Sequence, residues 1–167
     1  GPNGAGKSTT LRCLTGFLAP TSGQAFLAGF NMMDERIEGS RRLGYLGESG
    51  ALYPDLTPAS YLRFIGGTRG MDKGRLSESM DRVAQACQLE EVWNKPIRKL
   101  SRGFRQRVGL AQAILHDPEV LIMDEPTSVL TPQEVDILFE TLRKLKSEGT
   151  SILYISHKLE EIRALCD

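Results

Sequence analysis

The sequence predicts an α/β fold in which helices cover a parallel sheet. Residues 120–123 are a short, continuously hydrophobic run, as strands buried on both faces are, and residues 151–155, apolar except for Ser151, predict the next buried strand. A capped helix pattern lies between them, and further helix patterns lie upstream. Strands and helices that alternate in this order form a parallel sheet, because each helix returns the chain to the edge where the next strand begins.

The first part of the chain is expected to contain one helix and two short strands. Residues 7–16 have the pattern of a helix that leaves a glycine-rich loop. The apolar runs at 24–28 and 43–47 are short and flanked by glycine, which favours strands. A longer and more polar region follows them.

That middle region is predicted to be helical. Thr57 and Pro58 are a suitable N-cap and first residue for a helix through Ile65, and Ser101 can cap a later helix. A helix between them has one apolar face, made by Leu76, Met80, Val83, Ala84 and Cys87. The helix after Ser101 has its apolar face at Phe104, Val108, Ala111 and Leu115.

The last complete helix pattern has the clearest ends. Residues 131–134 combine a capping box with proline at the first helical position, and Gly149 ends the helix. Its expected buried stripe is Val135, Leu138, Phe139, Leu142 and Leu145. Residue 1 is not Met, and residues 162–167 stop within another helix pattern. We therefore expect an internal piece of a longer protein, incomplete at both ends.

Composition argues against several classes of protein. Lys plus Arg and Asp plus Glu are both 21, so the formal charge is zero and bulk charge does not favour nucleic-acid binding. No apolar run approaches the roughly 20 residues that a membrane-spanning helix needs. The 3 cysteines are scattered and lack CxxC spacing, which argues for a reducing compartment and against a disulfide or zinc framework.

Residues 1–8 match the phosphate-binding pattern G-x-x-x-x-G-K-[ST]. Glycines let successive N–H groups turn toward a phosphate, and the following helix adds its positive end. Lys7 would reach the β- and γ-phosphates, and the Ser8 hydroxyl would hold Mg²⁺. The predicted nucleotide-binding residues are Asn3, Gly4, Ala5, Gly6, Lys7, Ser8 and Thr9. The alternative is a glycine-rich turn that binds nothing.

Acidic residues and a histidine follow the two apolar runs, at the sheet edge where open α/β sheets bind ligands. Asp124 would ligate Mg²⁺, and Glu125 would polarise the attacking water. His157 follows the second run and is expected beside the γ-phosphate. An acidic pair here can also be a plain loop that leads into a helix, and a lone histidine can be structural. No role is assigned to His116.

Four motifs, in order along the chain, resemble those of the ATP-binding cassette (ABC) ATPases. Residues 100–107 resemble the family's signature, usually written LSGGQ. The phosphate loop, residues 121–126 and the Ser156-His157 pair supply the others, so the resemblance covers essentially the whole chain. It implies a phosphate-loop NTPase with a parallel, RecA-like sheet core and an inserted α-helical subdomain.

The resemblance also implies boundaries and partners. Residues 1–50 and 108–167 would form the partial core, and residues 51–107 the helical subdomain ending in the signature. Two cassettes would sandwich two ATP molecules, with Ser101 and Gly103 contacting the γ-phosphate of the other subunit. ATP-driven closure would pull on transmembrane permease subunits at the cytoplasmic face of the membrane. Exposed apolar residues near Tyr53 and Phe64 would touch the permease, or would instead serve to pack the helix onto its own domain.

Hydrolysis of ATP with Mg²⁺ would then reset the dimer. The catalytic set implied for this chain is Lys7, Glu48, Glu125 and His157, and the metal ligands are Ser8, Glu48 and Asp124. The isolated piece is expected to hydrolyse ATP weakly or not at all, because the strand before the phosphate loop is missing.

Several positions depart from the family's pattern. Glu48 and Thr131 stand where the family has Gln and Asp, and Arg102 and Phe104 replace Gly and Gln of the signature. Residues before about position 115 resemble drug- and gliding-type export cassettes, whereas later residues resemble those of simple-sugar and nucleoside importers. A natural or constructed chimera and the direction of transport both stay open.

Two other functions also stay open. A basic cluster favours a soluble ABC ATPase that acts on nucleic acid or ribosomes; it comprises Lys95, Arg98, Lys99, Arg102, Arg105 and Arg107. A solvated face beside the nucleotide is the preferred interpretation, and no nucleic-acid partner is expected. Glu48 and Thr131 would fit a catalytically silent cassette, but the intact Lys7, Asp124 and Glu125 argue against it.

Overall fold

The computed structural model describes residues 5–47 and 52–165, and it has the predicted α/β architecture. The main sheet has the order β3-β4-β5 with all neighbours parallel. The elements are α1 (Lys7–Leu14), β1 (Phe26–Leu27), β2 (Phe30–Asn31), α2 (Arg36–Arg41), β3 (Leu43–Leu46), α3 (Pro58–Thr68), α4 (Lys73–Ala86), the 3₁₀ turns Glu90–Val92 and Ile97–Lys99, α5 (Arg102–Ile114), β4 (Val120–Asp124), α6 (Pro132–Ser147), β5 (Ser151–Ile155) and α7 (Leu159–Leu165).

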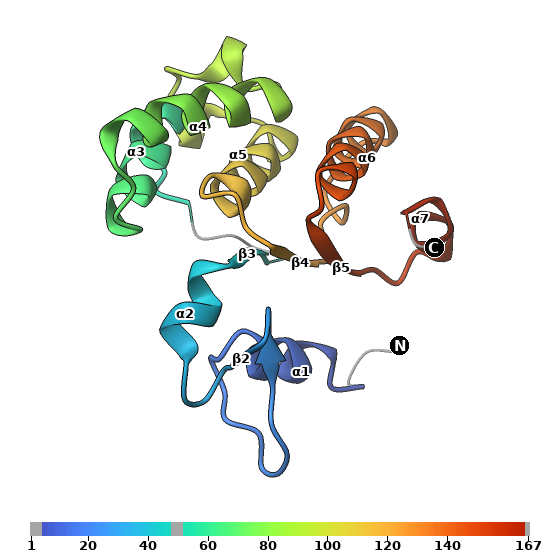
Figure 1. Cartoon of the computed structure of the whole chain (residues 1–167). Helices are drawn as coiled ribbons and strands as arrows, with labels where there is room; N and C mark the ends of the chain where they lie inside the picture. Colours follow the sequence, from blue (N-terminus) through green and yellow to red (C-terminus); the bar gives the residue numbers. More distant parts are fainter. Residues whose placement is uncertain (1–4, 48–51, 166–167) are drawn as a thin grey trace.

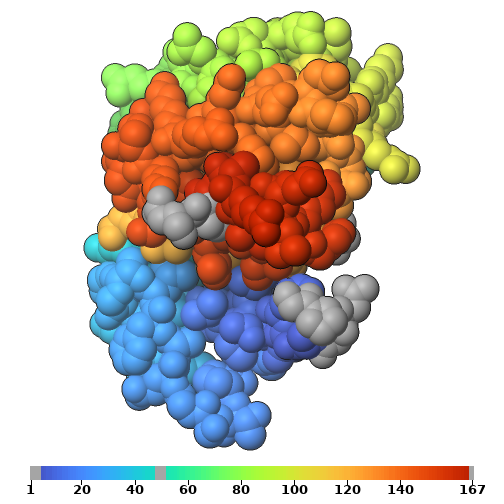
Figure 2. Space-filling model, turned by 90° about the vertical axis from the view of Figure 1, so that its right-hand side faces the viewer, coloured from blue at the N-terminus to red at the C-terminus, as the bar shows by residue number. Residues whose placement is uncertain are grey.

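Helices lie on both faces of this sheet (Figure 1). Alternate residues of β4 explain the two layers, because successive side chains of a strand point to opposite faces. Leu121 and Met123 belong to the larger apolar cluster, which includes α3 to α6. Ile122 belongs to a smaller cluster with Leu11 of α1. The segment containing β1 and β2 forms one end of the molecule, and the α3–α4 helices form the other (Figure 2).

Side-chain caps begin the helices where the sequence predicts them. Thr57 Oγ1 accepts a hydrogen bond from Ser60 N at 3.2 Å, and Ser101 Oγ accepts one from Phe104 N at 3.1 Å. Thr131 forms the expected capping box with Glu134 at the start of α6. These local signals are reliable because cap and partner are only three residues apart.

The strand expected at 24–28 does not join the main sheet. Its core, β1, pairs with β2 as an antiparallel hairpin. Ala28 and Gly29 connect the strands with φ values of 49° and 84°. Two successive positive φ values are the geometry of a type I′ turn, whose twist matches that of a hairpin.

The prediction that residues 151–155 form a buried strand is half wrong. β5 is a strand in parallel register with β4, but it lies at the edge of the sheet that the described residues form. Leu153 is 40% exposed there, whereas Leu121 and Met123 of the central strand are fully buried. None of the described helices is long and apolar enough to cross a bilayer.

Candidate functional site

The candidate site lies at the carboxyl edge of the parallel sheet. Asp124 ends β4, and Glu125 follows it in a left-handed conformation with a φ of 49°. Glu125 N donates a hydrogen bond to Ile155 O at 2.9 Å, so β5 holds this turn in place. A glutamate with positive φ is strained, and such backbone strain is concentrated at functional sites.

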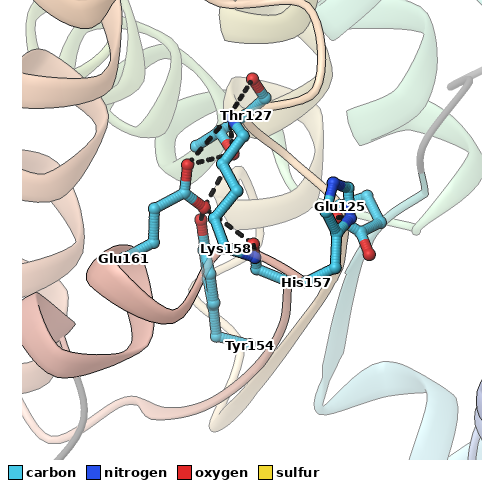
Figure 3. Close-up of polar contacts among 7 residues, drawn as sticks. Glu125, Thr127, Tyr154, His157, Lys158 and Glu161 are labelled. Carbon is cyan, nitrogen blue, oxygen red and sulfur yellow. Dashed lines mark hydrogen bonds and ion pairs between the residues drawn. The ribbon is translucent and has the colours of Figure 1, made fainter. Parts of the chain in front are cut away.

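The side chains of Glu125 and His157 make a polar contact at this edge. His157 Nδ1 lies 2.9 Å from Glu125 Oε2 (Figure 3). The Glu125 side chain is only 15% exposed, whereas the His157 side chain is 66% exposed. The structure therefore brings together two predicted residues from different strands, with the carboxylate sheltered and the imidazole open to solvent.

The described part of the phosphate loop leads directly into α1. Gly6 is the N-cap of this helix with a φ of 79°, a conformation for which glycine is favoured. No side chain of the described residues caps the N-terminus of α1. Ala5, Ser8 and Thr9 are exposed and Lys7 is half-buried. Helix N–H groups without a side-chain acceptor fit a phosphate. Asn3 and Gly4 lie outside the described residues.

Packing places α1 against the same strands that carry the acidic residues. Leu11 shares an apolar cluster with Ile122 of β4, and Ile155 of β5 packs against that cluster. Burial raises the pKa of Tyr45, the Asp124 carboxylate raises it further, and Arg12 of α1 opposes the shift. The packing of Leu11 with Ile122 is what brings α1 against β4.

Ser8 and Asp124 are a donor set that fits Mg²⁺. Magnesium prefers hard oxygen ligands and is commonly held by one or two protein oxygens, with phosphates and water completing the shell. Within residues 5–47 and 52–165, no cluster of three or more His, Cys, Asp or Glu forms an all-protein metal cage. Glu48, the third predicted ligand, lies outside the described residues.

The signature residues lie at the start of α5, close to the start of α6. Gly103 is buried, and a Cβ at this position would overlap the Glu134 carboxylate. Glu134 Oε2 also accepts hydrogen bonds from Thr131 N and Oγ1, at 2.9 and 3.0 Å. Sequence reasoning identified Glu134 only as a helix cap and missed its contact with the signature, because the two segments are 30 residues apart in the chain.

Glu161 is a buried acidic residue that the sequence did not single out. It is 8% exposed and is hydrogen-bonded to Thr127, Tyr154 and Ser156, and Figure 3 shows Thr127 and Lys158 between it and the Glu125–His157 pair. Glu160, its neighbour in sequence, is exposed. Two adjacent glutamates give no sequence signal of which one faces inward.

Two other predicted surfaces, the apolar one at Tyr53 and Phe64 and the basic cluster, differ in the contacts that their side chains make. Tyr53 and Phe64 are 53% and 49% exposed, and their rings meet edge to face with centroids 5.7 Å apart. In the basic cluster, Arg98 pairs with Asp55 at 2.6 Å, and Arg105 Nη1 donates to Leu100 O at 3.0 Å. Arg107 stacks on Phe104. Arg98, Arg105 and Arg107 thus have partners among the described residues.

Comparisons with known proteins agree with this arrangement. The family model described as ABC transporter matches residues 1–128. Nod factor export ATP-binding protein I of Cupriavidus metallidurans is 37% identical over 167 residues, which are all of this chain and 55% of that protein. The linearmycin resistance ATP-binding protein LnrL of Bacillus subtilis is 35% identical, with 54% of its length covered. The chain thus spans about half the length of these relatives.

Two further matches cover more of the related chain. The ABC transporter ATP-binding protein NatA of Bacillus subtilis is 34% identical over 169 residues, covering all of this chain and 68% of NatA. A solved ATP-binding subunit of an ABC transporter superimposes with a TM-score of 0.89 at 29% identity. That superposition covers 99% of this chain and 69% of the solved one.

Proposed function

Since the chain belongs to the ABC transporter family, we propose that it forms the ATP-hydrolysing part of an exporter's ATP-binding subunit. The observation that carries this proposal is the Glu125–His157 pair at the carboxyl edge of the sheet, on the strands that pack against the helix of the phosphate loop. Export is the direction named in relatives such as Nod factor export ATP-binding protein I.

In this proposal the phosphate loop binds the nucleotide. The N–H groups at the start of α1 and the Lys7 ammonium hold the phosphates, together with the loop residues Asn3 to Gly6 and Thr9. Ser8 and Asp124 hold Mg²⁺, with Glu48 as a further oxygen donor. The bound metal neutralises charge on the phosphates.

Glu125 is the general base in this proposal. Its carboxylate accepts a proton from the water that attacks the γ-phosphorus, while the bond from that phosphorus to the bridging oxygen of the leaving ADP breaks. Only 15% of the Glu125 side chain is exposed, which favours a directional contact with that water. When both ring nitrogens carry protons, His157 can donate from Nδ1 to Glu125 and from Nε2 to a γ-phosphate oxygen.

The partners in this proposal are a second cassette and transmembrane permease subunits. Ser101 and Gly103 contact the nucleotide of the second cassette, since Ser101 caps a helix whose N-terminus attracts anions. The exposed Tyr53–Phe64 pair contacts a permease at the cytoplasmic face of the membrane. Residues 1–50 and 108–167 act as the nucleotide-binding core, and residues 51–107 as the helical subdomain that carries the signature.

The test is Mg·ATP binding by the full-length protein and by its Lys7→Ala variant. We expect the variant to lose measurable binding in isothermal titration, because the ammonium that contacts two phosphates is gone. Lys73→Ala is the matched control, since Lys73 is an exposed lysine at the start of α4 and should not affect affinity. Unchanged affinity of Lys7→Ala would refute the phosphate-loop assignment.

A further inference from the structure

Near the segments that carry Glu125 and His157, one buried carboxylate, that of Glu161, accepts several hydrogen bonds. Thr127 Oγ1 lies 2.7 and 2.8 Å from the two oxygens of Glu161. Tyr154 OH donates to Glu161 Oε2 at 2.8 Å. Figure 3 shows the side chains of Thr127, Tyr154 and Lys158 near Glu161. They come from the β4 turn, from β5 and from the loop that follows β5.

The same carboxylate holds both neighbours of His157. Ser156 Oγ donates to Glu161 Oε2 at 2.9 Å, and Lys158 Nζ lies 3.1 Å from Glu161 Oε1. Lys158 N also donates to Ser156 Oγ at 3.0 Å. His157 is exposed, but the side chains of both its neighbours in the chain contact one carboxylate on α7.

The β4 turn is tied to that point as well. Thr127 stands two residues after Glu125 and is 1% exposed. Besides its hydrogen bond to Glu161, its carbonyl accepts a hydrogen bond from Lys158 Nζ at 3.3 Å. The segment that carries Glu125 and the segment that carries His157 therefore share one anchor.

The electrostatics suit an ionised anchor. Burial alone would raise the pKa of Glu161, but the hydrogen bonds from Thr127, Tyr154, Ser156 and Lys158 outweigh burial and lower it. Burial and the hydrogen bond to Glu161 raise the pKa of Tyr154, so its hydroxyl stays a donor. An ionised carboxylate only accepts hydrogen bonds, and all four partners can donate.

We propose that Glu161 is a positioning residue for ATP hydrolysis, which fixes the β4 turn and the loop after β5 so that Glu125 and His157 meet. This inference rests on the proposed ATPase function. It differs from a purely structural role, because loss of the anchor would misplace the reacting groups without weakening the phosphate loop. Small displacements of catalytic groups are costly even when the fold persists.

The first test is steady-state ATP hydrolysis by the full-length Glu161→Gln protein. Glutamine keeps the shape but brings an NH₂ group against donors, so the anchor loosens. We expect kcat to fall by about 10- to 100-fold and KM for ATP to change by less than about twofold. Glu160→Gln is the matched control, since this exposed neighbour should leave both constants unchanged. A wild-type kcat in Glu161→Gln, or a loss confined to KM, would overturn the proposal.

The second test compares the substitution in two backgrounds. If Glu161 acts through His157, Glu161→Gln should lower the single-turnover rate much less in a His157→Ala protein than in the wild type. An equal fold-loss in both backgrounds would indicate an independent structural effect and contradict positioning. Should Glu161→Gln fail to fold, Ser156→Ala removes one of the donors; it should lower kcat several-fold, and a wild-type kcat would overturn the proposal.

The two proposals fail in different ways. A wild-type protein that does not hydrolyse ATP would refute the proposed function, and the positioning role would fall with it. A wild-type ATPase that depends on Lys7 but is insensitive to Glu161→Gln would refute the positioning role alone.

Discussion

The strands of the β3-β4-β5 sheet begin at its amino edge and end at its carboxyl edge. Each of these two edges carries a glutamate and a histidine, but in contrasting settings. Glu119 and His116 precede β4 at its amino end, whereas Glu125 follows β4 and His157 follows β5 at the carboxyl edge. His116 is 7% exposed and its Nε2 lies 3.0 Å from Leu43 O, which joins the loop before β4 to the start of β3. His157 is exposed and holds a sheltered carboxylate instead.

This contrast teaches that a histidine's surroundings, and not its presence, indicate its task. At the amino edge, burial and the nearby Arg69 and Arg75 favour the neutral imidazole of His116, and its contact with Leu43 O makes it part of the core. At the carboxyl edge, a strained glutamate and an open imidazole are available to a ligand, and a buried carboxylate holds the segments around them. Substitutions at the amino edge should therefore affect folding, and substitutions at the carboxyl edge should affect chemistry.

The largest expected effect separates the two glutamates that flank β4. Glu125→Gln should lower the ATP hydrolysis rate by about 100- to 10,000-fold, the range for loss of a general base, while Mg·ATP binding persists. Glu119→Gln changes an exposed residue at the other edge and should leave the rate unchanged. The rate of phosphate release under saturating ATP is measured for both variants. A Glu125→Gln enzyme with the full rate would contradict the assignment of chemistry to the carboxyl edge.

The next effect is a pH dependence of stability at the amino edge. Burial, with Arg69 and Arg75 adding to it, lowers the pKa of His116 from 6.5 to about 4. Between these pH values the unfolded chain binds a proton at this histidine that the folded chain does not. The free energy of unfolding therefore falls as the pH drops from about 6.5 to 4, and the full contribution of His116 is present above pH 6.5. The expected loss is up to about 3 kcal/mol.

Urea unfolding at pH 7 and pH 4.5 measures this loss, and His116→Gln isolates it from other titrating groups. Glutamine keeps an N–H donor near Leu43 O but does not titrate, so the variant should lose less stability over this pH range than the wild type. Equal losses in both proteins would show that His116 is not held neutral by burial.

The smallest effect concerns the exposed ion pair beside His116. Arg42 Nε lies 2.8 Å from Glu119 Oε1, and both side chains are substantially exposed. Exposed pairs of this kind contribute about 0.2–1 kcal/mol, so Glu119→Gln, which removes this pair and leaves the Arg42 contacts with Phe30 and Glu38, should lower the free energy of unfolding by less than about 1 kcal/mol. If the free energy of unfolding fell by several kcal/mol, this ion pair and not His116 would be the main stabilising contact at the amino edge.

Much of the fold followed from local sequence patterns. The caps at Thr57, Ser101 and Thr131 were predictable, since a capping side chain and its N–H partner lie within one helical turn. The strands β3, β4 and β5 were predictable from short apolar runs. The short helix α2 and the strand β2 were missed, because six and two residues carry too little periodicity to register.

The candidate site was predictable only in part. Motif spacing indicated Lys7, Asp124, Glu125 and His157, and the structure places Glu125 and His157 in contact. The roles of Glu134 beside Gly103 and of Glu161 near His157 depend on side chains meeting across the fold. The exposure of β5 likewise depends on which strands neighbour it, which an apolar run alone does not specify.

The most direct test of the carboxyl-edge account is an experimental structure of the full-length Glu125→Gln protein with Mg·ATP. We expect the triphosphate along the start of α1, with the γ-phosphate next to residue 125 and His157 and with Mg²⁺ bound by Ser8 and Asp124. A nucleotide bound away from this edge, with no contact to the loops after β4 and β5, would contradict the assignment of the catalytic site.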